Sequence, residues 1–121
     1  MNKGILKEKS FRFAVRIVNL YKHLCEEKRE FVLSKQALRS GTSVGAMVRE
    51  AEHSESKADF IHKMAIAQKE INETIYWLEL MCETAYLSVK EFESINSDAA
   101  ELMKMLTSSV KTAKSSLTTN H

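Results

Sequence analysis

Two short carboxylate–histidine pairs contain side chains that could bind a metal ion. Glu50 and His53 are three positions apart, as are Asp59 and His62, so each pair would share one helical face. Di-iron bundles place two such pairs in mid-bundle, with a carboxylate from each of two further helices. Here the pairs flank a predicted helix–helix connection, and the inward positions are apolar. We therefore expect charged surface pairs, with no metal site and no cofactor; stoichiometric metal in the purified protein would contradict this.

The possible nucleophiles lie in unsuitable surroundings. Cys25 and Cys82 fall on predicted apolar stripes, where free cysteine usually behaves as a small hydrophobic residue. Ser40 and Ser43 lie beside Gly41, but no strand precedes them as in a nucleophile elbow. The glutamates within residues 70–83 are spaced as an exposed acidic helix face. We predict no catalytic residue and a protein that is not an enzyme.

Positive charge is concentrated in the first third of the chain. Eighteen Lys and Arg against sixteen Asp and Glu give a net charge of only +2, which argues against polyanion binding through bulk charge. Residues 1–39 nevertheless hold ten basic and four acidic residues, residues 40–101 hold five and twelve, and residues 102–121 add three lysines. Such a local patch could contact phosphates; the alternative is an ordinary solvated helix face. The candidate phosphate contacts are Lys7, Arg12, Arg16, Lys22, Arg39, Lys104, Lys111 and Lys114.

Long helices must position these residues. The sequence has no proline and three glycines, and apolar residues recur every three or four positions in four segments, roughly 10–27, 33–53, 56–85 and 88–117. Ser56 with Asp59, and Ser88 with Glu91, are typical of helix N-termini. Short connections make neighbouring helices antiparallel. We predict an all-α, up-down-up-down four-helix bundle, a single domain over residues 1–121, in which basic residues from both ends of the chain gather together.

The apolar pattern also predicts how the helices pack. Ala37, Gly41 and Gly45 recur every four residues, which would let a neighbouring helix approach the second segment closely. The first helix has two adjacent apolar stripes, which begin at Phe11 and Phe13. A small bundle has difficulty burying so much apolar surface, and exposed aromatic patches generally mark interfaces. We expect a homo-oligomer, with an interface formed by Tyr76, Trp77, Leu80 and Met81.

Membrane association and secretion have no support in the sequence. No apolar run reaches the roughly 20 residues of a membrane span, and no segment resembles a secretory signal. Two cysteines provide no disulfide framework. We expect a cytoplasmic protein with no membrane partner.

Several runs of residues resemble one known family. They are Leu38-Arg39-Ser40-Gly41-Thr42-Ser43-Val44-Gly45-Ala46, Arg49-Glu50-Ala51, Ser56-Lys57-Ala58-Asp59-Phe60-Ile61, Tyr76-Trp77-Leu78 and the segment 102–112. Together they resemble the four-helix-bundle proteins encoded by intervening sequences of bacterial 23S ribosomal RNA genes. The resemblance extends over almost the whole chain.

This resemblance implies partners more than it implies chemistry. The family includes accessory proteins of diversity-generating retroelements, and it implies a ring-like homopentamer whose positive surface binds nucleic acid and a protein partner. It supplies no catalytic residues. We therefore expect a non-enzymatic oligomer that binds structured RNA or DNA, or a nucleic-acid-bound partner. The alternative is a protein–protein interaction scaffold with no nucleic-acid role.

Overall fold

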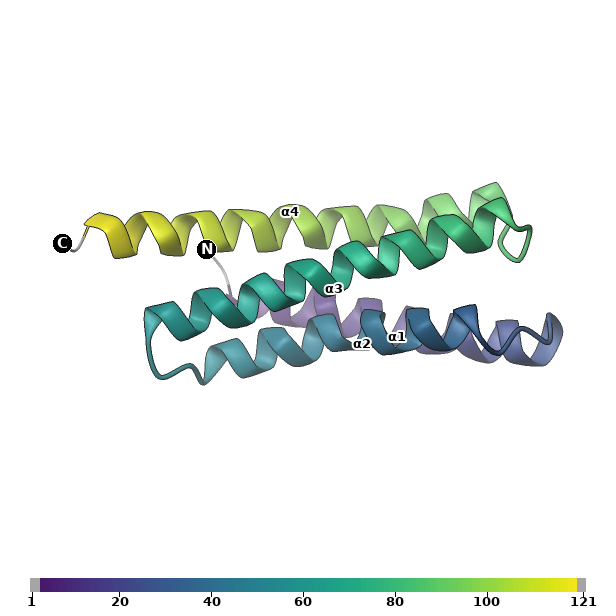
Figure 1. The fold of residues 1–121 in the computed structure, drawn as a ribbon, viewed down its shortest axis with the longest axis horizontal. Coiled ribbons are helices and arrows are strands. Elements are labelled where there is room, and N and C mark those ends of the chain that lie inside the picture. Colours follow the sequence, from purple (N-terminus) through teal and green to yellow (C-terminus); the bar gives the residue numbers. More distant parts are fainter. Residues whose placement is uncertain (1–2, 120–121) are drawn as a thin grey trace.

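The computed structural model describes residues 3–119 and contains four helices in these residues (Figure 1). They are α1 (Lys3–Glu27), α2 (Leu33–Glu52), α3 (Lys57–Glu83) and α4 (Val89–Thr119). The predicted all-α four-helix bundle is confirmed. The first two and last two residues of the predicted 1–121 domain lie outside the described residues.

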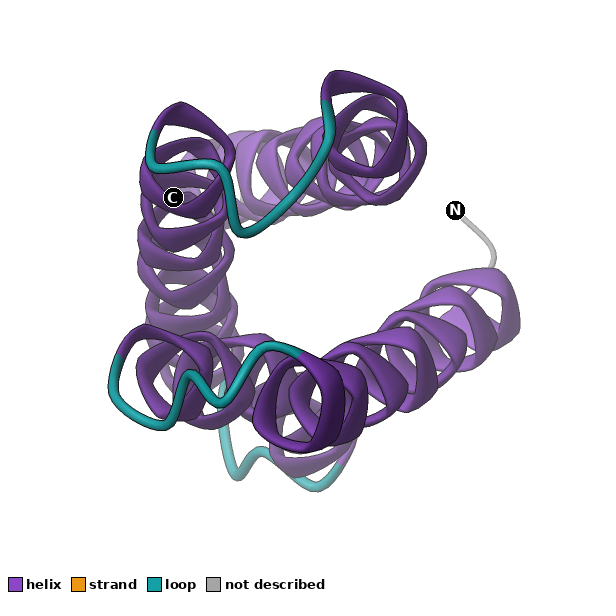
Figure 2. Cartoon of the chain, turned by 90° about the vertical axis from the view of Figure 1, so that its right-hand side faces the viewer, coloured by secondary structure: helices purple, strands orange, loops and turns teal. Residues whose placement is uncertain are grey.

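Contacts between the helices show that each neighbour runs antiparallel to the next. From α2 to α3, Arg39 reaches Glu70 while the later residue Glu50 reaches the earlier residue Lys63. The same reversed order relates α1 to α2, α3 to α4, and α1 to α4. The four helices surround a common axis, and α1 packs against α4 less than the other neighbouring pairs pack together (Figure 2).

The first helix begins earlier than predicted, at Lys3 instead of residue 10. Leu6 and Ser10 are almost completely buried, so the inward stripe continues through the first turns. The Ser10 hydroxyl donates to the carbonyl of Lys7, which removes its need for another partner in the core. Charge among the first nine residues led us to place the start too late, because charged side chains occupy only the outer face of these turns.

The predicted starts of the last two helices are confirmed within one residue. The Ser56 hydroxyl accepts the backbone N–H of Asp59 at 3.0 Å. Ser88 and Glu91 form a reciprocal capping box, in which each side chain accepts the other's backbone N–H, at 2.8 and 3.0 Å. These hydrogen bonds satisfy N–H groups that the first turn of a helix leaves without partners.

Small residues bring α1 and α2 close together, as predicted. Ala37, Gly41 and Val44 are buried on the face of α2 that packs in the core. A β-carbon added at Gly41 would lie 2.8 Å from Cγ1 of Ile17, so the isoleucine occupies the space that a larger residue would need. The glycine therefore permits the contact between the two helices.

The core differs from the predicted stripes at two places. Phe13 and Ile17 are buried, but Phe11 is 54% exposed, so only one of the two stripes of α1 enters the core. Near the end of α3, Met81 is fully buried, whereas Cys82 is half-buried. Both positions follow Leu78 at helical spacing, and packing against α4 selects the first. Ala85 leaves the predicted helix altogether, with a φ of 69° in the turn before α4.

Within residues 3–119, none of the helices is both long enough and apolar enough to span a membrane.

Candidate nucleic-acid interface

The second half of α4 is a basic and hydroxyl-rich surface. Glu101 is the last acidic residue of the chain, and Lys104, Lys111 and Lys114 follow it. All three lysines are exposed. Lys104, Ser108, Lys111 and Ser115 follow at spacings of four, three and four, so they share one exposed face of the helix. We call these four residues the α4 stripe.

The α4 stripe begins beside α1 and extends beyond it. The amino group of Lys9 lies 3.1 Å from a carboxylate oxygen of Glu101, which sets the register of the two antiparallel helices. Lys104 is therefore level with the first turns of α1, and Lys111 lies past the start of that helix (Figure 1). The predicted gathering of basic residues from both ends of the chain reduces to Lys7, Lys9 and Lys104 near this level.

The arginines and lysines that α1 contributes to the candidate set are mostly engaged by carboxylates. Lys7 lies 3.8 Å from Glu52, and Arg12 lies 3.8 Å from Glu8. The Arg16 guanidinium is 2.7 Å from the carboxylate of Asp98, and it also donates to the Ser94 hydroxyl and carbonyl. A phosphate would have to displace these carboxylates. This acid pairing is a tertiary feature that composition along the chain does not reveal.

Arg39 is also engaged, on the outer surface of α2 and α3. Its guanidinium forms ion pairs with Glu73 and, at 3.3 Å, with Glu70. The hydrogen bond to Glu73 raises the pKa of Arg39 above its usual value. The indole N–H of Trp77, and then Arg39, hold the pKa of Glu73 below its usual range. Arg39 therefore connects two helices in this chain.

Lys22, Lys104 and Lys111 remain available to an outside anion. Among residues 3–119, no carboxylate oxygen lies within ion-pair distance of their amino groups. Lys22 lies on α1, apart from the other two. The structure thus brings two of the eight predicted contacts, with Lys114 nearby, onto one continuous surface. The hydroxyls of Ser108 and Ser115 were missed, although their four-three-four spacing with the lysines was visible in the sequence.

The two carboxylate–histidine pairs do not form one cluster. Glu50 pairs with Lys63 at 3.0 Å, and the Asp59 carboxylate accepts the backbone N–H of Glu55 at 3.4 Å. In the described part of the chain, no three His, Cys, Asp or Glu side chains gather as metal ligands would. The coordinates give His53 and His62 no carboxylate neighbour within ion-pair distance among these residues.

The predicted oligomer interface divides into exposed and buried residues. Tyr76 is 55% exposed, and its ring meets Trp77 edge to face at 5.0 Å between centroids. Trp77 and Leu80 are half-buried. Met81 is fully buried in the core of its own chain, so it has no surface for a partner chain. The helix turns Met81 inward because it follows Leu78 by three residues.

Comparison with known proteins agrees with this fold. The family model described as 23S rRNA-intervening sequence protein matches residues 3–108. The chain belongs to this family. A similar solved structure is a protein of unknown function from the S23 ribosomal protein family of Bacteroides thetaiotaomicron, with 58% sequence identity and a TM-score of 0.90. The likeness covers 92% of this chain and 99% of that one. No curated protein sequence matches the chain.

The match to the 23S rRNA-intervening sequence proteins ends at residue 108, within the α4 stripe. Lys104 and Ser108 therefore lie inside the matched region, whereas Lys111 and Ser115 lie beyond it. The name of the family refers to a gene location, and the Bacteroides protein carries no assigned function.

Proposed function

We propose that this member of the 23S rRNA-intervening sequence proteins is a non-enzymatic homo-oligomer that binds structured RNA or DNA through the α4 stripe. The observation that supports the proposal is the acid-free second half of α4, where Lys104 and Lys111 are exposed and without carboxylate partners among the described residues. Lysine and hydroxyl side chains are common donors to phosphate oxygens. The stripe would position a nucleic-acid backbone without reading its bases.

The spacing of the α4 stripe suits a series of phosphates. Seven residues separate Lys104 from Lys111, which corresponds to about 10 Å along a helix. Ser108 lies between them on the same face and can donate a hydrogen bond to a phosphate oxygen. Such contacts depend on charge neutralisation, so their strength falls steeply as salt rises.

Assembly of several copies is the second part of the proposal. The resemblance discussed above suggests a pentamer, and large apolar side chains on α1 and α3 are exposed in the single chain, including Phe11, Val15 and Tyr76. The proposal places the protein in the cytoplasm, where Cys25 and Cys82, both unpaired here, would remain reduced. It assigns no catalytic residue and no cofactor.

Fluorescence anisotropy with a labelled RNA hairpin and a DNA duplex, measured across a salt series, tests the nucleic-acid part. We expect Lys104→Glu/Lys111→Glu to weaken binding at least about tenfold and to reduce the salt slope by about two. Lys35→Glu/Lys69→Glu is the matched control, because it changes the same charge at exposed positions outside the α4 stripe. Equal losses in both variants would mean that only net charge matters, which would contradict the assignment.

The second candidate function is a protein–protein interaction scaffold. The observation that favours it is that Lys7, Arg12, Arg16 and Arg39, half of the predicted phosphate contacts, are paired with carboxylates of the same chain. Absence of any binding to RNA or DNA at low salt, where surface electrostatics are strongest, would exclude the first function and favour this one.

A further inference from the structure

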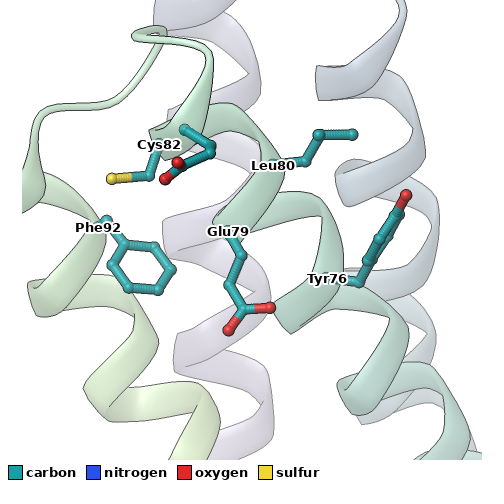
Figure 3. A pocket seen from close by; sticks show the side chains of 6 residues that line it. Tyr76, Glu79, Leu80, Cys82 and Phe92 are labelled. Carbon is teal, nitrogen blue, oxygen red and sulfur yellow. The ribbon is translucent and has the colours of Figure 1, made fainter.

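An open groove with an acidic rim lies between the last part of α3 and the start of α4 (Figure 3). Its volume is about 470 Å³. Leu80 and Phe92 are half-buried and form apolar walls, and Glu79 lies between Phe92 and Tyr76 in the view of Figure 3. Glu79 and Glu83 are exposed, and neither carboxylate has an ion-pair partner in the described part of the chain. We call Tyr76, Glu79, Leu80, Glu83 and Phe92 the acidic groove.

The outer surface of α1 has the opposite charge and is also apolar. Phe11 and Val15 are 54% and 45% exposed. The guanidinium of Arg49, from α2, lies 5.3 Å from the centre of the Phe11 ring. Arg12 is adjacent, and its only printed ion pair, with Glu8 at 3.8 Å, is so exposed that exchange for another carboxylate costs little. We call Phe11, Arg12, Val15 and Arg49 the basic ridge.

Within one chain the basic ridge does not contact the acidic groove. The ridge belongs to α1 and α2, the groove belongs to α3 and α4, and α1 is not a packing neighbour of α3. Phe11 and Tyr76 therefore lie on different sides of the bundle. Any contact between these two surfaces must join two molecules.

The two surfaces lie at similar levels along the bundle. Arg16, one residue after Val15, reaches Ser94 and Asp98 of α4. Gln68 of α3 donates to Thr107 of α4, and counting along the antiparallel helices from this pair places Glu79 level with the same stretch, between residues 94 and 98. Two copies with parallel bundle axes can therefore bring ridge and groove together without sliding past each other.

We propose that the acidic groove of one copy receives the basic ridge of a second copy of this chain. This inference rests on the proposed homo-oligomer and specifies its contact surfaces. Phe11 and Val15 bury against Tyr76, Leu80 and Phe92, while Arg12 and Arg49 face Glu79 and Glu83. Because the two surfaces differ, each copy uses both, and the contact repeats around a ring until it closes.

Charge exchange tests the contact by sedimentation velocity on the full chain. We expect Glu79→Lys/Glu83→Lys, and separately Arg12→Glu/Arg49→Glu, to reduce the assembly to single chains. The variant that combines all four substitutions restores opposite charges across the contact, and we expect it to regain the wild-type mass. Glu26→Lys/Glu27→Lys is the matched control for charge, since both residues are exposed on the last turn of α1, outside ridge and groove. Circular dichroism verifies that every variant remains helical.

The outcomes separate this inference from the broader proposal. If the wild type sediments as an assembly and Glu79→Lys/Glu83→Lys keeps its mass, the contact surfaces are wrong while the homo-oligomer stands. If the helical combined variant stays a single chain, the pairing of ridge with groove is wrong. A wild type that is a single chain at all concentrations overturns both. Nucleic-acid binding by the α4 stripe is measured independently of all three results.

Discussion

At the scale of single residues, Glu30 fixes the start of α2. Its carboxylate accepts the backbone N–H groups of Val32, Leu33 and Ser34, at 3.0, 2.9 and 2.7 Å. Arg29 precedes it with a φ of 55°, an uncommon conformation for a residue other than glycine. Burial raises the pKa of Glu30, but these three donors outweigh it and hold the pKa below its ordinary value of 4.5.

We expect Glu30→Ala to lower the free energy of unfolding by about 1–2 kcal/mol, because the first N–H groups of α2 lose their acceptor. Since folding lowers this pKa, the stabilisation is complete above pH 4.5 and is lost as the pH falls through the folded-state pKa. Urea unfolding of the wild type and Glu30→Ala at several pH values measures both effects. A stability difference that stays constant down to the most acidic pH would contradict the role of the carboxylate.

The two glycines of α2 should respond differently to substitution. A β-carbon at Gly41 would lie 2.8 Å from the Ile17 side chain, whereas one at Gly45 would lie 3.4 Å from the Ser10 carbonyl oxygen, an ordinary contact. We expect Gly41→Ala to destabilise by about 1–3 kcal/mol through overpacking. Gly45→Ala should be neutral or stabilising by up to about 1 kcal/mol, from helix propensity alone. Thermal unfolding of the two variants compares them directly, and equal shifts would contradict the proposed role of Gly41.

The sequence predicts one of these two features and not the other. The four-residue spacing of Ala37, Gly41 and Gly45 indicates close helix packing, and the contact with Ile17 confirms it. Glu30 gives no comparable signal, because glutamate is not a usual N-cap residue. Its role depends on the backbone conformation of Arg29, which turns the chain so that a side chain before the helix reaches three N–H groups.

At the scale of the elements, the end of α3 shows where spacing fails to decide. Met81 and Cys82 follow Leu78 by three and four residues, and both distances are compatible with one helical stripe. The sequence therefore predicts four helices well but leaves the inward residue at this turn open. Packing against α4 decides it, and likewise ion pairing across helices decides which candidate cations remain available.

We expect Met81→Ala to destabilise the protein by about 2–5 kcal/mol, because a fully buried side chain leaves a cavity. Cys82→Ala removes a half-buried side chain at the margin of the acidic groove and should cost less than about 1 kcal/mol. Chemical denaturation of both variants distinguishes the two positions. A larger loss for Cys82→Ala would restore the stripe that the sequence spacing first indicated.

At the scale of the whole molecule, the charges separate into surfaces with different tasks. Carboxylates on α4 pair with Lys9 and Arg16 and connect the two helices that pack least. Beyond Glu101 the same helix has no acid, so its lysines face solvent. Because the α4 stripe lies at one end of the bundle and the basic ridge at mid-length on α1, assembly and nucleic-acid binding can be changed separately.

This separation predicts an effect of avidity. Phe11→Ser/Val15→Ser removes apolar surface from the basic ridge without altering any charge, so we expect single chains with an intact α4 stripe. If each assembly presents several stripes, a long structured RNA gains affinity from simultaneous contacts, whereas a hairpin that occupies one stripe does not. The variant should therefore lose at least about tenfold in affinity for the long RNA and retain its affinity for the hairpin. Anisotropy titrations of both RNAs at one salt concentration measure this, and an equal loss for the two would show that the substitutions had damaged the binding surface itself.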